Sequence, residues 1–499
     1  MTTIVALLVV GPILAAACGL LVRRTPVLRD TITLTSLVLS TAGSVWLLIG
    51  VEADGPAVLR VGGWHPELGI VLVADLFAAL ILMVATATIL VVQVFAIAQR
   101  QTIWAADPEL SGAILLVLSS GVSLAFLTGD LFTLFVAFEM ILVCSYVLLT
   151  HQGRRGQINS GMTYVVMNLM ASTFFLIGLA FVYTATGTVN MALLAERIPQ
   201  LADGTRFGIG LWFLIVFGTK AAAFPLFSWL PDSYPTAPTT ITAVFAGLLT
   251  KVGVYSLIRF NTLTGMEELG PVILVVSALT MLVGVAGALA QDDVKRILSF
   301  HIVSQIGYML MGVGLFTLAG VAGAVLYLVH HIPVKTVLFL VGGLIEDAER
   351  TSALDEIGGL ARRRPMIAVL FAIPALSLAG LPPFSGFIAK LALIDAGIAD
   401  ARVAIVVVAL LTSVLTLLSM TKIWLNVFWG DELEVDPDES TAGLDPTVGR
   451  RRRIMEGTTA VAVLATLVVA VFAGPLSDVS ERAAIDLIEP ARYIGEVLS

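Results

Sequence analysis

The sequence predicts an all-α polytopic membrane protein. Of its 499 residues, 58% are hydrophobic and only 13% are charged, whereas charged residues make up about one-quarter of a typical soluble domain. Apolar runs of about 20 residues recur along the whole chain, and a helix of that length crosses a hydrocarbon core of about 30 Å. Low charge and repeated long apolar runs together predict membrane-spanning helices as the dominant element.

We expect about fourteen spanning helices. In chain order they cover residues 3–22, 31–51, 70–98, 110–128, 131–150, 160–184, 207–230, 238–260, 270–290, 297–317, 319–345, 366–396, 402–429 and 454–474. They group into an N-terminal three-helix segment, two inverted five-helix repeats that each contain a broken helix, a cytoplasmic loop, and a last span with a short tail. The boundaries of these five parts are 1–105, 106–262, 266–430, 431–453 and 454–499.

Basic residues alternate between the two sets of loops. One set holds Arg23, Arg24, Arg29, Arg100, Arg154, Arg155, Lys295, Arg296, Arg350, Arg362 to Arg364 and Arg450 to Arg453, and the other holds Arg60, Arg197, Arg206, Arg259, Arg402, Arg482 and Arg492. The positive-inside rule places the first set in the cytoplasm and both termini outside it, as an even number of spans requires. A bacterial-type inner membrane is the expected location. The tail after Pro475 is interpreted as an interfacial or partner-binding helix or as a solvated tail.

Several functions are excluded by missing motifs. Cys18 and Cys144 lie inside apolar runs without metal-ligand spacing. The sequence shows no nucleotide loop, flavin motif or iron–sulfur cysteine set, and no basic stripe of the kind that binds nucleic acid. We therefore expect no cofactor, metal, nucleotide or nucleic acid, and no enzyme of a recognisable type.

Lysines are placed differently from arginines. The arginines stay in loops or at helix ends, whereas Lys220, Lys251 and Lys390 lie inside apolar runs. An ionisable group at the bilayer centre costs a few kcal/mol on insertion scales. Arginine keeps its charge in a protein, but a lysine taken out of water can lose its proton. This distribution predicts lysines that titrate inside the membrane. Lys295 is expected in a loop, and Lys422 is expected to reach the interface near a helix end.

Glu139 is the acid expected to act with these lysines. It lies near the middle of the run LFTLFVAFEMILVCSYVLL, where an unpaired carboxylate is unfavourable and a lysine neighbour would stabilise its charge. The alternative is a fixed structural ion pair. Asp75 and Asp130, which lie at helix starts, are interpreted as interfacial or capping carboxylates.

Prolines next to the buried charges predict broken helices. Pro225 follows Lys220, Pro333 lies in the segment HHIPVK, and Pro382 and Pro383 precede Lys390. Proline removes a backbone hydrogen bond, and a broken helix persists in a membrane only where protein or water satisfies the freed groups. The segment HHIPVK contributes His330, His331 and Lys335, which predict a proton relay because histidine titrates near neutrality.

Two lysine pairs recur at nearly the same interval. Lys390 follows Lys220 by 170 residues and Lys422 follows Lys251 by 171, with five helices in each interval. An odd number of helices reverses the topology of the second copy, so this spacing predicts an inverted repeat like those of transporters.

Several ordered motifs resemble one family. They are FExxLxxSYxLL around Glu139, FGTKAAAFPLFSWLPDSYPTAPT, AGLLTKVGVYSLIR, SFHIVSQIGYM, HHIPVKTVLFL and GLPPFSGFIAK. Together they resemble the antiporter-like membrane subunits shared by Mrp cation/proton antiporters and respiratory complex I. The length, the PTAPT segment and the lysine at position 390 are most similar to the Mrp D subunit.

The resemblance implies a proton path of two half-channels joined by a polar axis at mid-membrane. In this path Glu139 is the switch acid, Lys220 its partner and proton carrier, Lys251 the central relay, His330, His331 and Lys335 the link, and Lys390 the terminal carrier. It also implies partner subunits in the bilayer and exchange of H⁺ for Na⁺ or a similar ion, so the chain would be a secondary transporter subunit.

Two alternatives remain. One is a proton-pumping subunit of complex I or of a related membrane hydrogenase, for which one relative is expected to carry glutamate at position 390. The other is a non-conducting scaffold subunit, against which the insertion cost of several buried charges argues.

Overall fold

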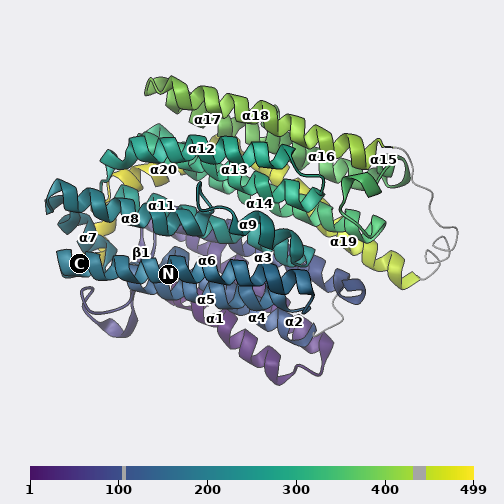
Figure 1. The fold of residues 1–499 in the computed structure, drawn as a ribbon. Helices are drawn as coiled ribbons and strands as arrows, with labels where there is room; N and C mark the ends of the chain where they lie inside the picture. The colour runs from purple at the N-terminus through teal and green to yellow at the C-terminus, as the bar shows by residue number, and fades with distance from the viewer. Residues whose placement is uncertain (104–107, 431–445) are drawn as a thin grey trace.

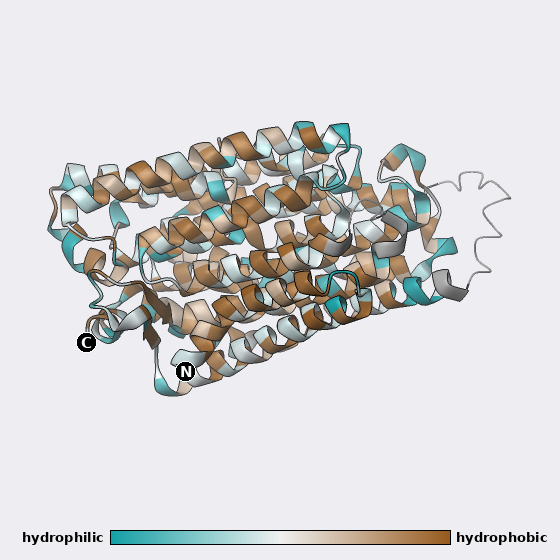
Figure 2. Ribbon diagram, turned by 90° about the horizontal axis from the view of Figure 1, so that it is seen from below, coloured by the Kyte–Doolittle hydropathy of each residue, from teal (hydrophilic) through white to brown (hydrophobic). Residues whose placement is uncertain are grey.

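The computed structural model is a bundle of long helices that lie side by side (Figure 1). It describes residues 1–103, 108–430 and 446–499, so the predicted loop 431–453 lies largely outside the described residues. Hydrophobic residues follow the length of the bundle, and hydrophilic residues gather towards its two ends (Figure 2). This distribution matches a protein whose middle layer lies in hydrocarbon.

The helices fall into two halves along the chain. The first half contains α1 (Thr2–Leu21), α2 (Pro26–Asp54), α3 (Leu76–Ile103), α4 (Pro108–Leu127), α5 (Leu131–Thr150), α6 (Arg155–Thr186), α7 (Met191–Arg197), α8 (Asp203–Ala221), α9 (Trp229–Ser233), α10 (Thr239–Val244) and α11 (Thr250–Leu263). The second half contains α12 (Gly270–Leu289), α13 (Val294–Leu315), α14 (Leu318–Glu349), α15 (Leu360–Arg363), α16 (Pro365–Ala379), α17 (Ser385–Ala399), α18 (Val403–Ile423), α19 (Pro446–Val471), α20 (Ala473–Ile488) and α21 (Ala491–Leu498).

Twelve helices in the described part of the chain are long and apolar enough to cross a membrane. The other two predicted spans, 207–230 and 366–396, are each divided into two helices, α8 with α9 and α16 with α17. Pro225 lies between the first two, and Pro382 and Pro383 lie between the second two. The polytopic helical class is therefore confirmed, whereas the count of fourteen and the inverted repeats stay predictions.

Two predicted elements need correction. The expected helix 70–98 begins only at Leu76, because Val71–Ala74 forms strand β2, which pairs antiparallel with β1 (Ala57–Arg60). Helix α14 continues through Pro333 without a break. The predicted interruption at Pro333 is therefore wrong, since a helix inside a protein can absorb one missing backbone bond when neighbouring helices hold it.

Ion pairs distinguish the two ends of the bundle. At the end that we call the basic end, Lys295 pairs with Glu346 at 2.6 Å, Lys422 with Asp292 at 2.7 Å and Arg363 with Glu349 at 3.0 Å. At the opposite end, Arg206 pairs with Glu268 at 2.6 Å and Arg197 with Glu67 at 2.7 Å. Lys295 and Arg363 belong to the basic set predicted for the cytoplasmic side, and Arg206 and Arg197 belong to the other set.

The C-terminal helices α20 and α21 dock on the opposite end. Ala483, Ala484, Leu487, Tyr493 and Val497 are buried, and the Arg60 guanidinium donates to the Val497 carbonyl at 3.1 Å. The tail is therefore helical and packed, and the alternative of a solvated tail is wrong.

Under this tail lies a buried ion pair. Arg259 of α11 holds Asp75 with two hydrogen bonds, one of them 2.7 Å long, and also donates to the Tyr255 hydroxyl at 3.0 Å. Its guanidinium lies 5.4 Å from the ring centres of Phe77 and Tyr493. Asp75 also accepts from the Ala78 amide at 2.9 Å, and Asp130 accepts from the Thr133 amide at 2.6 Å. The capping role predicted for both aspartates is confirmed.

We expect Asp75→Asn to lower the free energy of unfolding by about 3 kcal/mol, because it leaves the buried Arg259 charge without its partner. Thermal unfolding of the purified protein, followed by tryptophan fluorescence, measures the change. Asp400→Asn is the matched control, since the Arg402–Asp400 pair is partly exposed and such pairs contribute below about 1 kcal/mol. Equal stability of the two variants would contradict a structural role for the buried pair.

Candidate functional site

Glu139 lies in the middle of α5, and its Oε1 atom is buried without a hydrogen-bond partner among the described residues. The preceding residue, Phe138, contacts the lysine predicted to be the partner: the Lys220 Nζ atom lies 5.4 Å from the centre of its ring. The structure therefore places Lys220 beside the segment of α5 that carries Glu139.

Lys220 occupies the last turn of α8, directly before the break. The helix ends at Ala221, and Ala222 adopts a left-handed conformation with φ of 61°. The ammonium donates to the Asn168 carbonyl at 3.3 Å and to the Ser172 hydroxyl at 3.1 Å, both on α6. A cavity of about 20 Å³ adjoins Lys220 and Asn168, which is enough for one water molecule.

Lys251 is completely buried near the start of α11. A π-helical turn, Phe245–Leu249, precedes it, and a π turn leaves backbone carbonyls outside the regular helical pattern. The Lys251 ammonium donates to one of them, the carbonyl of Ala246. Gly253 lies two residues further along α11, where a Cβ atom would come within 2.6 Å of the Ala221 amide nitrogen. Glycine therefore allows α11 to contact the end of α8 that carries Lys220.

His330, His331 and Lys335 are buried on α14. The Lys335 ammonium donates to the Leu298 carbonyl of α13 at 3.0 Å. The His330 Nδ1 atom lies 2.9 Å from the Ser385 hydroxyl, at the start of α17. Both ring nitrogens of His331 are buried without a hydrogen-bond partner among the described residues. Pro333 lies between His331 and Lys335 in the sequence, inside an unbroken helix.

Lys390 of α17 uses the carbonyls freed at the second break. Its ammonium donates to the Leu378 and Ala379 carbonyls at 3.0 and 3.2 Å and to the Ser413 hydroxyl at 3.1 Å. The last carbonyls of a helix have no partner inside that helix, and here the lysine supplies one. The same ammonium lies 4.7 Å from the centre of the Tyr308 ring.

None of the predicted proton-transfer residues hydrogen-bonds to another within the described ranges. Four of the buried lysines, Lys220, Lys251, Lys335 and Lys390, bond to carbonyl or hydroxyl oxygens, and no carboxylate of the described residues forms a salt bridge with these four. The structure thus distributes the predicted ionisable groups over α5, α8, α11, α14 and α17, and their hydrogen bonds in the described part of the chain go to uncharged polar groups.

The polar groups of α13 were not among the site residues predicted from the sequence. His301 lies 2.9 Å from the Ser419 hydroxyl, Tyr308 lies 2.8 Å from the Ser413 hydroxyl, and Gln305 accepts from Tyr327. The rings of Tyr308 and Tyr327 stack at 5.3 Å. A signal was present, since positions 301, 305 and 308 are spaced by four and three residues and share one helix face.

The two remaining lysines, Lys295 and Lys422, have structural partners. Lys295 was predicted in a loop, but it is buried in the first turn of α13. Its partner Glu346, on α14, also accepts a hydrogen bond from the Thr239 hydroxyl at 2.5 Å. The loop prediction failed because α13 begins closer to the charged residues than expected. Lys422 donates to the Leu289 and Gln291 carbonyls at 3.2 and 2.7 Å, which fits the structural interpretation of this residue.

Comparison with known proteins gives consistent matches. The family model for the NADH:quinone oxidoreductase/Mrp antiporter transmembrane region matches residues 128–416. The chain is similar to the D subunit of the Na⁺/H⁺ antiporter of Alkalihalophilus pseudofirmus, with 41% identity over 91% of both chains, and to that of Bacillus subtilis, with 34% identity over the full length of both.

A solved structure matches equally well. A chain of the Mrp complex from Dietzia sp. DQ12-45-1b superimposes with a TM-score of 0.91, with 34% identity over the full length of both chains. The family model covers more than half of this chain, and the relatives align along nearly all of it. The chain therefore belongs to the NADH:quinone oxidoreductase/Mrp antiporter family of membrane subunits.

Proposed function

We propose that this chain is the proton-translocating subunit of a multisubunit Na⁺/H⁺ antiporter. Protons move along an axis that contains Glu139, Lys220, Lys251, the link of His330, His331 and Lys335, and finally Lys390. The observation that carries the proposal is a row of four lysines that are at most 5% exposed, lie inside the bundle, and have no carboxylate salt-bridge partner among the described residues.

The same chain contains a fixed ion pair, with which the lysines of the proposed axis can be compared. Arg259 and Asp75 form a bidentate pair with further contacts to aromatic rings, as expected of a permanent structural charge. The four lysines of the proposed axis instead bond to carbonyl and hydroxyl oxygens, which can accept a hydrogen bond from either the charged or the neutral amine. Such sites can gain and lose a proton without leaving a carboxylate unpaired.

Glu139 is suited to the role of a switch. Its buried Oε1 atom has no hydrogen-bond partner among the described residues, so the carboxylate is not anchored by a donor. When Glu139 lies close to Lys220, its negative charge stabilises the ammonium, and when that charge moves away or is protonated, the stabilisation is lost. The proton of Lys220 then passes towards Lys251 on α11, whose Gly253 packs against the α8 backbone at Ala221.

The second half of the axis continues from α14 to α17. His330 contacts Ser385 at the start of α17, and Lys390 lies five residues further along that helix. Neutral imidazole can both donate and accept a hydrogen bond, so the two histidines connect the lysines of α11 and α14 with the terminal carrier.

The exchanged ion and the partners follow from the relatives. The relatives in Alkalihalophilus pseudofirmus and Bacillus subtilis are both named as the D subunit of a Na⁺/H⁺ antiporter, and the structural match comes from an Mrp complex. We infer that this chain works with other antiporter subunits in a bacterial cell membrane, with its basic end in the cytoplasm and both termini outside.

We expect Lys220→Ala and Lys220→Arg both to reduce Na⁺-dependent proton movement to below about one-hundredth of the wild-type rate, since proton transfer by a positioned group contributes at least about that factor. Arginine keeps the charge but does not release its proton. The assay uses everted vesicles from a host without its own sodium antiporters that expresses the complete complex, with ΔpH recorded after addition of Na⁺.

The matched control is Lys422→Ala, which removes a lysine outside the axis and should retain at least about half of the wild-type rate, because partly exposed ion pairs contribute little. Co-purification of the other subunits tests whether each variant still assembles. Full transport by an assembled Lys220→Arg complex would exclude Lys220 as a proton carrier.

A further inference from the structure

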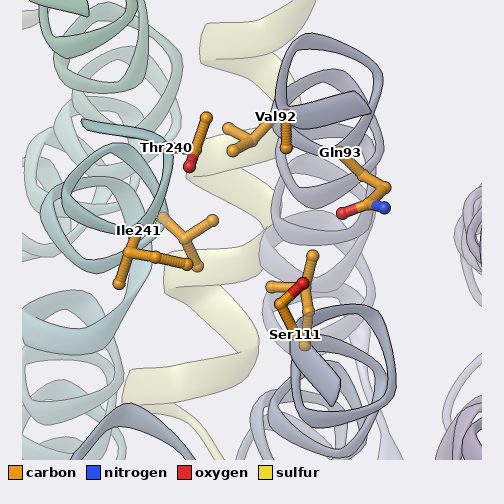
Figure 3. Close-up of a pocket in the computed structure, with 8 residues that line it drawn as sticks. Val92, Gln93, Ser111, Thr240 and Ile241 are labelled. Atoms are coloured by element: carbon orange, nitrogen blue, oxygen red, sulfur yellow. The ribbon is translucent and has the colours of Figure 1, made fainter. Parts of the chain in front are cut away.

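Polar side chains in the bundle differ in whether they contact the proposed axis. Gln93 of α3 and Thr240 of α10 line a cavity of about 20 Å³, and Figure 3 shows the Gln93 amide nitrogen turned away from Thr240. No lysine of the described ranges lines this cavity. Ser413 of α18, in contrast, accepts a hydrogen bond from the Lys390 ammonium at 3.1 Å. The Ser413 hydroxyl therefore contacts a proposed proton carrier directly.

Lys390 has three oxygen partners among the described residues, and they differ in what they can do. The Leu378 and Ala379 carbonyls, at the end of α16, are acceptors only. The Ser413 hydroxyl has one hydrogen and two lone pairs, so it can accept from an ammonium or donate to an amine. Three acceptors match the three hydrogens of an ammonium, whereas a neutral amine has two hydrogens and a lone pair. When Lys390 loses its proton, Ser413 is the one of these three partners that can become a donor.

Tyr308 of α13 sets the direction of the Ser413 hydroxyl when Lys390 is charged. The Tyr308 hydroxyl lies 2.5 Å from the Ala409 carbonyl and 2.8 Å from the Ser413 hydroxyl. A carbonyl has no hydrogen to donate, so the single hydrogen of Tyr308 goes to Ala409, and its oxygen accepts from Ser413. The hydrogen bonds therefore run in one direction, from the ammonium through the two hydroxyls to the carbonyl.

Loss of the proton reverses one bond of this series. The two hydrogens of the neutral amine stay with the Leu378 and Ala379 carbonyls, and its lone pair then faces Ser413. Rotation of the Ser413 hydroxyl moves its hydrogen from Tyr308 to the amine, and no backbone movement is needed. Because a buried polar group without a partner is unfavourable, this rotation keeps the Lys390 nitrogen satisfied in both protonation states.

The other lysines of the row show where such a hydroxyl occurs. Lys251 and Lys335 each donate to a backbone carbonyl. Lys220, like Lys390, lies beside a helix break and donates to a carbonyl and to a serine hydroxyl, that of Ser172. In the described part of the chain, serine hydroxyls thus contact the first and the last lysine of the proposed axis.

We propose that the Ser413 hydroxyl rotates with the protonation state of Lys390, pointing to Tyr308 when the lysine is charged and to the amine when it is neutral. This inference rests on the proposed function, in which Lys390 is the terminal carrier. On release, one N–H bond of Lys390 breaks, the proton passes to a water molecule, and the electron pair stays on the nitrogen, where it accepts from Ser413. Ser413 and Tyr308 are positioning residues that keep their own protons.

Four variants test the proposal in the assembled antiporter complex. Ser413→Ala removes the rotating hydroxyl, and Ser413→Thr keeps a hydroxyl as the rescue variant. Tyr308→Phe keeps the ring beside Lys390 and removes the oxygen that accepts from Ser413. The matched control is Thr416→Val, since Thr416 is buried on the same helix and its hydroxyl bonds to the Thr412 carbonyl at 2.7 Å.

We expect Ser413→Ala to lower the rate of Na⁺-dependent ΔpH collapse in everted vesicles by about tenfold, the factor for one lost hydrogen bond to a charged group. Tyr308→Phe should lower it by about fivefold, because the bond between two neutral hydroxyls is weaker. Ser413→Thr and Thr416→Val should stay near the wild-type rate. The ratio of rates in H₂O and D₂O should rise in Ser413→Ala, since proton transfer at Lys390 then limits transport.

Co-purification of the other subunits shows whether each variant assembles. A wild-type rate in an assembled Ser413→Ala complex would overturn the proposal. The same holds if Ser413→Thr is as slow as Ser413→Ala, or if the H₂O/D₂O ratio of Ser413→Ala equals that of the wild type, because a purely structural defect would not change this ratio.

Lys390→Arg separates this inference from the proposed function. Arginine keeps the charge but does not release its proton, so the proposed axis requires an inactive complex that still assembles. If Lys390→Arg is inactive and Ser413→Ala is fully active, Lys390 stands as the terminal carrier and the rotating hydroxyl is wrong. If the assembled Lys390→Arg complex transports normally, the axis is wrong at this residue, and the role of Ser413 is wrong with it.

Discussion

Hydrocarbon cannot hydrogen-bond to a backbone, and this constraint determines where the chemistry of the chain lies. Every interruption of a helix inside the bilayer must be satisfied by the protein itself. At the second break Lys390 donates to the last carbonyls of α16, and at the π-helical turn before α11 Lys251 donates to the Ala246 carbonyl. At the first break the Trp229 indole donates to the Thr219 carbonyl, one residue before Lys220. Irregular backbone and lysines thus occur together because the freed carbonyls accept hydrogen bonds from the buried ammonium groups.

The same constraint separates two kinds of buried charge. Arg259 at the opposite end is held by a carboxylate, a phenol and three aromatic rings. The lysines of the row have only neutral acceptors among the described residues. A fixed charge stabilises the docking of α20 and α21, whereas charges without a fixed counter-ion can change with protonation. The ion pairs with carboxylates therefore lie near the ends of the bundle, whereas the lysines with neutral hydrogen-bond acceptors lie in its interior.

Much of this arrangement could be predicted from the sequence. Apolar runs identified the spanning helices, and lysines and one glutamate inside those runs identified the candidate axis. The breaks near Pro225 and near Pro382 and Pro383 followed from the missing amide of proline. Pro333 shows the limit of that argument, because a proline alone does not reveal whether neighbouring helices will hold the helix together. Other features depend on contacts that a linear pattern does not contain. The β1–β2 hairpin was missed because Val71–Ala74 continues directly into an apolar helix, and the role of Lys295 depends on Glu346, fifty-one residues later.

The contact at Gly253 has a mechanical consequence. Because no side chain separates α11 from the end of α8, the two backbones touch at Ala221, and close-packed interiors transmit displacements with little compression. A shift of the broken end of α8 therefore moves the segment that carries Lys251. The close contact at Gly253 thus couples the backbone next to Lys220 to the backbone next to Lys251.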